Sequence, residues 1–155
     1  MLAALSASGA MTSGPDTALV QASAVAIGGR ALLIEGQSGI GKSSLALALI
    51  DRGAVLIGDD GVRLSLESDR VLASPPPNIT GKLEIRHVGI ADVPVTSAPL
   101  ALIITLGKDA PRFVDEAPRR DVKGISVPCI TLPAHDPILA LRAEWALTLH
   151  GLCMG

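Results

Sequence analysis

The stretch that decides the fold runs from residue 34 to residue 53 and reads IEGQSGIGKSSLALALIDRG. It carries the spacing G-x-x-x-x-G-K-S, which begins at Gly36 and ends at Lys42 and Ser43. The apolar run at residues 30–35 predicts a buried strand, and residues 42–52 are good helix formers followed by a glycine. A strand, this loop and a helix in succession predict a phosphate-binding loop.

Each residue type in this loop suits the binding of a nucleotide. Glycines let backbone N–H groups turn inward around phosphate oxygens, and the start of the helix adds the positive end of its dipole. Lys42 brings a mobile positive charge to the transferring phosphate, and the Ser43 hydroxyl is a hard oxygen ligand for Mg²⁺. The expected nucleotide-binding residues are Gly36, Gln37, Ser38, Gly39, Ile40, Gly41, Lys42 and Ser43.

Two adjacent aspartates, Asp59 and Asp60, follow a second predicted buried strand at residues 54–58. Ligands of α/β sheets bind at the carboxyl ends of strands, so the pair is expected near the phosphate loop. There one carboxylate would lie near Mg²⁺ and the other would accept a proton. Asp-Asp-Gly is also common turn chemistry, and that alternative stays open.

The run GKLEIRHVGIADV at residues 81–93 places charged side chains in an apolar, alternating pattern. Glu84 and Arg86 are two residues apart, so on a strand they face the same side. That side is either a functional surface or a solvated strand face.

The remaining pattern predicts a single mixed α/β domain over residues 1–155, with residues 1–15 loosely ordered. After the first strand and helix, the regular alternation of a doubly wound fold is missing. The expected elements are a strand at 17–27, a hairpin at 62–74, irregular structure at 74–81, strands at 99–106 and 124–132, an exposed loop at 107–123, and a helix capped by Asp136 and ending at Gly151.

Composition excludes several classes of protein. The net charge of −2 without a basic run argues against a nucleic-acid partner. No segment approaches the roughly 20 apolar residues of a membrane helix, and no basic residue precedes the apolar N-terminal run as in a signal peptide. Cys129 and Cys153 are isolated, which predicts free thiols in a reducing cytoplasm.

Taken together, the phosphate loop, LIGDDGVRL, ASPPPNITG and LEIRHVGIADV resemble the HPr kinase/phosphorylase family. The resemblance covers about residues 17–137 and the family's catalytic domain. It implies a P-loop-containing mixed β-sheet akin to phosphoenolpyruvate carboxykinase. It also implies that ATP with Mg²⁺ phosphorylates a serine of the phosphocarrier protein HPr, that phosphate can reverse this reaction to give pyrophosphate, and that the chain assembles as a homo-hexamer.

The resemblance also assigns roles to individual residues. Lys42 would contact the moving phosphoryl group, while Ser43 and Glu84 would hold Mg²⁺. Asp60 would be the base in the kinase direction and the acid in reverse, with Asp59 beside it. The family's catalytic arginine corresponds to Arg112, and Arg119 is a poorer match.

Two departures from the family pattern concern the reverse reaction. Gln21 stands where the family usually has a histidine, fifteen residues before Gly36. Glutamine forms hydrogen bonds but does not take a proton at pH 7. The segment LPAHDPILA at residues 132–140 replaces a family stretch tied to dephosphorylation.

Two other functions fit the motifs. A small-molecule P-loop kinase would need a concave acceptor pocket with further polar side chains. A nucleotide-binding regulatory module with little catalysis would bind ATP without transferring phosphate, and Gln21 keeps this alternative open.

Overall fold

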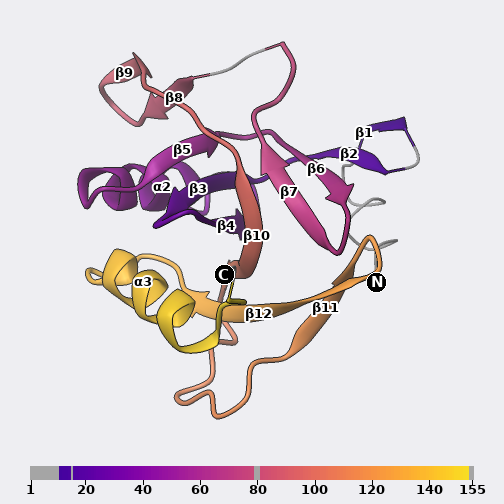
Figure 1. The fold of residues 1–155 in the computed structure, drawn as a ribbon. Coiled ribbons are helices and arrows are strands. Elements are labelled where there is room, and N and C mark those ends of the chain that lie inside the picture. The colour runs from indigo at the N-terminus through magenta and orange to yellow at the C-terminus, as the bar shows by residue number, and fades with distance from the viewer. Residues whose placement is uncertain (1–10, 15, 79–80, 154–155) are drawn as a thin grey trace.

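The computed structural model describes residues 11–14, 16–78 and 81–153. Two helices and a large curled sheet make up most of this part of the chain, and a separate hairpin, β8–β9, stands beside them (Figure 1). In chain order the elements are β1 Met11–Gly14, β2 Thr17–Val20, β3 Ser23–Ile27, β4 Arg30–Glu35, α2 Lys42–Asp51, β5 Val55–Gly58, β6 Val62–Glu67, β7 Arg70–Ser74, β8 Lys82–Ile85, β9 Gly89–Asp92, β10 Ala98–Gly107, β11 Arg119–Val122, β12 Ile125–Pro133 and α3 Leu139–His150.

Strand β10 is the centre of the sheet because it joins two halves of different character. One half is antiparallel and runs β1-β2-β6-β7-β10. In the other half β10 runs parallel to both β4 and β12, while β3 lies antiparallel between β4 and β5. Strands β4 and β5 therefore point the same way and end at the same edge of the sheet.

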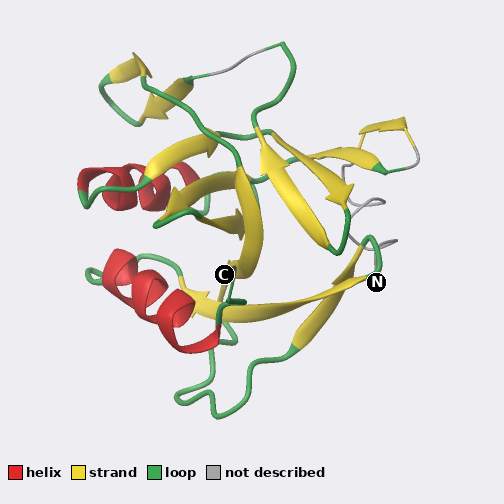
Figure 2. Cartoon of the chain, viewed as in Figure 1, coloured by secondary structure: helices red, strands yellow, loops and turns green. Residues whose placement is uncertain are grey.

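Both faces of the central strands are buried, which explains their near-continuous apolar sequence. On β4, Leu32 and Ile34 pack with the two helices, whereas Ala31 and Leu33 pack into a second core against the antiparallel half. Both helices lie on one side of the sheet (Figure 2). Leu45, Ala46 and Leu49 of α2 are fully buried there, together with Ala143 and Leu147 of α3.

The predicted mixed α/β fold is confirmed, as are both helices, the strands at β4, β5, β10 and β12, and the β6–β7 hairpin. The expected single strand at residues 17–27 is wrong. The chain bends at Gln21 and Ala22, so β2 pairs with β6 in one half of the sheet and β3 pairs with β4 and β5 in the other. The run at 17–27 contains no glycine or proline to signal this change.

Three other expectations need correction. The exposed loop expected at 107–123 ends in a strand, β11, which pairs with β12 through Lys123 and Gly124; both have positive φ, as a type I′ turn requires. The run 81–93 is a hairpin of β8 and β9, so Arg86 lies in its turn rather than on a strand. Residues 11–14, expected to be loosely ordered, form β1; residues 1–10 and 15 lie outside the described part.

The predicted C-terminal helix starts later than its expected Asp136 cap. The helix begins at Leu139, and the Asp136 Oδ1 accepts a hydrogen bond from the Ile138 backbone N–H at 3.1 Å. Asp136 therefore closes the turn before the helix, in the way aspartates commonly do two residues ahead of a backbone N–H.

Candidate active site

The phosphate loop connects the end of β4 to the start of α2, as predicted. The Lys42 Nζ donates hydrogen bonds to the backbone oxygens of Gly36 at 2.9 Å and Gln37 at 3.0 Å. Gly36 has a φ of +154°, and a Cβ there would lie 2.9 Å from the Ile40 Cγ2. A side chain at position 36 would therefore push the loop out of shape.

The N-terminus of α2 is arranged to receive an anion. Its N-cap residue, Gly41, has a φ of +119° and no side chain with which to cap the helix, and the first turn contains no acidic residue. The first backbone N–H groups of a helix lack partners within the helix and carry its positive dipole end. These groups of α2 suit phosphate oxygens.

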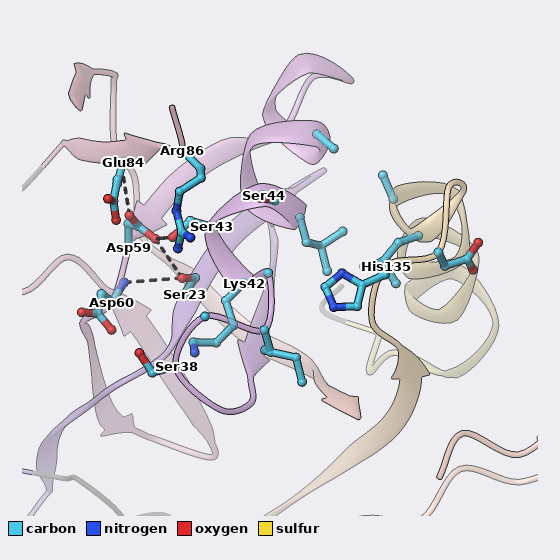
Figure 3. A pocket seen from close by; sticks show the side chains of 18 of the residues that line it. Ser23, Ser38, Lys42, Ser43, Ser44, Asp59, Asp60, Glu84, Arg86 and His135 are labelled. Carbon is cyan, nitrogen blue, oxygen red and sulfur yellow. Dashed lines mark hydrogen bonds between the residues drawn. The ribbon is translucent and has the colours of Figure 1, made fainter. Parts of the chain in front are cut away.

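Asp59 links the phosphate loop to the β8–β9 hairpin (Figure 3). Its Oδ1 accepts a hydrogen bond from the Ser43 Oγ at 2.5 Å, and its Oδ2 accepts one from the Glu84 backbone N–H at 3.2 Å. These contacts bring together Ser43, Asp59 and Glu84, which the sequence had placed in one site. The neighbouring Asp60 is exposed and has a positive φ of 59°.

Ser23 on β3 is a member of this network that the sequence analysis missed. It is fully buried, its Oγ donates to the Asp59 Oδ1 at 3.0 Å, and the Asp60 backbone N–H donates to the same Oγ at 3.4 Å. Ser23 lies within the range predicted as a strand, residues 17–27. The only sign of its role in the sequence is that it is polar while its neighbours, residue 22 and residues 24–27, are apolar.

A cavity of about 420 Å³ runs from these carboxylates past the phosphate loop to the segment before α3. Figure 3 shows Asp59, Asp60, Glu84 and Arg86 at one end and His135 across the cavity from Lys42 and Ser44. The far wall consists of His135, Asp136, Pro137, Leu139 and Ala140.

The His135 end of the cavity was not among the predicted site residues, although the sequence carries a signal for it. Strand β12 runs parallel to β10, which runs parallel to β4. The residues that follow β12 therefore reach the same sheet edge as the phosphate loop. The strand-end rule applied to Asp59 and Asp60 also applies to His135 and Asp136.

Oxygen ligands at the carboxylate end fit Mg²⁺. The described residues contain no group of three His, Cys, Asp or Glu side chains that could hold a metal. A magnesium ion bound with a nucleotide needs only one or two carboxylates beside the phosphates and water. Ser43, Asp59 and Glu84 supply such oxygens at one end of the phosphate loop.

Two predicted site residues lie elsewhere. Gln21 lines a second cavity of about 850 Å³, which lies against the phosphate loop at Gly36, Gln37 and Ile40 and also contains Glu35 and Arg120. Arg112 is exposed in the loop between β10 and β11 and lines neither cavity. Arg119 is exposed on β11, where its Nη1 donates to the Ser126 backbone oxygen at 3.2 Å.

The family is shown by comparison with known proteins. Residues 15–137 match the protein family described as "HPr Serine kinase C-terminal domain". The chain belongs to this family. The HPr kinase/phosphorylase of Clostridium acetobutylicum is 39% identical over 123 residues, which cover 70% of this chain and 40% of the relative. That of Clostridium tetani is 36% identical over 118 residues, covering 68% of this chain and 39% of the relative.

The fold is also similar to that of a solved structure. The Hpr(Ser) kinase/phosphatase from Coxiella burnetii matches with a TM-score of 0.75 and 33% identity, over 84% of this chain and 88% of that chain. The chain spans about two fifths of the length of the two clostridial relatives. No helix in the described part of the chain is long and apolar enough to cross a membrane.

A pKa shift in the cavity wall leads to a first prediction. The pKa of the Asp136 carboxyl lies below its ordinary value, first because the Ile138 backbone N–H donates to it and second because Arg142 does so. We expect ¹³C NMR titration to show this carboxyl ionising below the range of an unpaired aspartate. In Arg142→Ala the pKa of Asp136 should return only part of the way to its ordinary value, since the hydrogen bond from the Ile138 backbone N–H remains.

The sign of this effect follows from linkage. A carboxyl whose pKa is lower in the folded state adds stability above its unfolded pKa and loses it as the pH falls through the folded value. An Asp136 titration that returned to the ordinary range in Arg142→Ala would show that the arginine, and not the backbone, is the main cause.

Proposed function

We propose that this chain is a protein-serine kinase that transfers a phosphoryl group from ATP to a serine of an HPr-type phosphocarrier protein. The observation that supports this best is the Asp59 carboxylate, held between the phosphate-loop serine and the β8–β9 hairpin. It places a proton acceptor beside the end of the loop where the terminal phosphate of a nucleotide would lie. The named activities of the relatives support the same reaction class.

In this proposal the phosphate loop binds the nucleotide and Lys42 neutralises the transferring phosphoryl group. The lysine already lies over the loop, held by the Gly36 and Gln37 oxygens. Ser43 and Glu84 would hold Mg²⁺, which neutralises charge on the phosphates when bound. Phosphoryl transfer needs little beyond positioning and electrostatic stabilisation of this kind.

The contacts favour Asp59 over Asp60 as the proton acceptor, the reverse of the assignment made from the sequence. A carboxylate has about four acceptor positions, and Asp59 uses two on Oδ1 and one on Oδ2. The remaining position on Oδ2 can receive the proton of a serine hydroxyl. Those three hydrogen bonds also fix the carboxylate in place, as general base catalysis requires.

The other end of the cavity is proposed to hold the nucleoside. A nucleotide with its phosphates on the start of α2 has its base near Ala48, Leu139 and Ala140, which are partly buried and apolar. His135 adds a ring that can stack on the base or donate a hydrogen bond to it. This arrangement matches the usual pattern of an apolar cleft with a few polar groups.

Gln21 and Arg112 keep their expected roles as proposals. We propose that Arg112 approaches the transferring phosphoryl group when the loop between β10 and β11 closes over the site. Gln21 would replace the family histidine, so removal of phosphate from the phosphoserine by inorganic phosphate, giving pyrophosphate, should be slower than the forward reaction.

Partner, assembly and location are part of the same proposal. The acceptor is an HPr-type phosphocarrier, and the chain is proposed to work as a homo-hexamer. Both Cys129 and Cys153 are free, which supports a reducing, cytoplasmic location.

Mass spectrometry of a purified HPr-type protein tests this proposal directly. After incubation with this chain, ATP and Mg²⁺, we expect one added phosphoryl group on a serine. Subsequent addition of excess phosphate should remove it slowly and release pyrophosphate. ATP binding without any added mass would contradict the kinase and support a regulatory nucleotide-binding module. Transfer to a small molecule instead would identify a small-molecule kinase.

A further inference from the structure

Four polar side chains form a closed ring of contacts across four neighbouring strands, outside the cavity that holds Asp59 and Lys42. Three of them, Glu35, Thr105 and Arg120, line the second cavity described above. Strand order places β4, β10, β12 and β11 side by side, and the ring takes one residue from each. The members are Glu35, Thr105, Cys129 and Arg120.

An ion pair holds this ring together. The Arg120 Nη1 donates to the Glu35 Oε2 at 2.9 Å and its Nη2 donates to Oε1 at 2.6 Å, a two-point contact. The Thr105 Oγ1 donates to the same Oε1 at 3.0 Å. The Cys129 Sγ lies 3.7 Å from the Thr105 Oγ1 and 3.6 Å from the Arg120 Nη2.

The pair is costly to bury, which calls for an explanation other than stability. The Arg120 and Glu35 side chains are only 24% and 20% exposed. Removing two charges from water costs free energy that their attraction does not always recover. The hydrogen bond to Glu35 is also the main reason that the pKa of Arg120 is raised, so the arginine keeps its charge.

The position of each partner suggests what the pair does. Glu35 is the last residue of β4, and Gly36 follows directly as the first residue of the phosphate loop. The chain is closely packed on one side of Gly36, where an added Cβ would lie 2.9 Å from the Ile40 Cγ2 and 3.2 Å from the Leu106 backbone oxygen. Because Glu35 is bonded directly to Gly36, the position of the Glu35 side chain bears on where the loop starts.

The other partner lies at the end of the loop proposed to close over the site. Residues 108–118 connect β10 to β11 and include Arg112, and Arg120 follows two residues after that segment. The Cys129 backbone N–H donates to the Pro118 oxygen at 2.8 Å, which fixes the same end of the segment to β12. Through its ion pair with Glu35, Arg120 thus connects the end of this segment to the start of the phosphate loop.

We propose that Glu35 and Arg120 are positioning residues, whose ion pair sets the 108–118 segment, and with it Arg112, relative to the phosphate loop. This inference rests on the proposed function for its kinetic consequence. Its structural consequence, a segment held in place by the pair, is independent of any substrate.

The test compares Arg120→Lys and Glu35→Gln with a matched pair elsewhere. Arg52→Lys alters an arginine that contacts Glu144 between α2 and α3 at 2.8 Å, far along the chain from this ring. Arg120→Lys keeps the charge and loses the two-point contact. We expect Arg120→Lys to lower kcat for phosphoryl transfer about tenfold, with a smaller change in the KM for ATP, and Arg52→Lys to change neither.

Two further measurements separate positioning from a general loss of structure. In an Arg112→Ala background, Arg120→Lys should cause no additional loss of kcat, because the residue through which it acts is gone. Hydrogen exchange of the unliganded protein should be faster over residues 108–118 in both ring variants and unchanged in Arg52→Lys. The proposal is overturned by full additivity with Arg112→Ala or by unchanged exchange over this segment.

The exchange measurement also separates this inference from the proposed function. If the wild-type chain transfers no phosphate to an HPr-type protein, the kinase proposal fails, and faster exchange in the ring variants still supports the positioning role. If the kinase is active and exchange does not change, only the positioning role fails.

Discussion

Replacing Lys42 by methionine is expected to lower phosphoryl transfer about a thousandfold or more. Methionine keeps much of the length of the side chain and removes the only charge that the phosphate loop itself contributes. It also removes the hydrogen bonds to the Gly36 and Gln37 oxygens, so the loop loses an internal tie. Single-turnover transfer of labelled phosphate from ATP measures the loss.

A matched lysine makes this result interpretable. Lys123 lies in the turn between β11 and β12 and lines neither cavity. Lys123→Met should transfer phosphate at the wild-type rate, and circular dichroism should show that both variants keep the fold. A Lys42→Met protein with more than a tenth of wild-type activity would be incompatible with the proposed role of this lysine.

Sequence reasoning worked best where local pattern and tertiary role coincide. The phosphate loop has a fixed spacing, a buried strand before it and a helix after it, and each of these is a local property. The Asp59 and Glu84 assignments also needed the sheet to bring distant strand ends together. The order β4-β3-β5 does this for Asp59, and the Asp59 contact with the Glu84 backbone does it for the hairpin.

What the sequence could not predict was contact between side chains from distant strands. Ser23 is a lone polar residue in an apolar strand, and only the pairing of β3 with β5 brings it to the aspartates. Glu35 and Arg120 are 85 residues apart, and Arg120 lay in a stretch read as an exposed loop. The one local signal for β11 was the glycine of the Lys123–Gly124 pair. A two-residue hairpin turn needs positive φ, which glycine adopts easily and which both residues have.

Asp59 and Asp60 have different proposed roles, so replacing each should lower phosphoryl transfer by a different factor. Asp59→Asn should lower transfer about a hundredfold or more, because the amide cannot accept a proton from the attacking serine. Asp60→Asn should lower it less than about tenfold, since the Asp60 carboxylate forms no hydrogen bond with another described residue. Nucleotide binding, followed by fluorescence of a labelled ATP analogue, should survive in both variants.

A control variant separates loss of the base from a disturbance of the contacts around it. Ser23→Ala is the matched control: it removes one hydrogen bond from Asp59 and leaves the carboxylate, so the rate of transfer should fall moderately and by much less than in Asp59→Asn. A larger loss of transfer in Asp60→Asn than in Asp59→Asn would return the base to Asp60. Asp59 would then act only to orient Ser43, with which its carboxylate is already in contact.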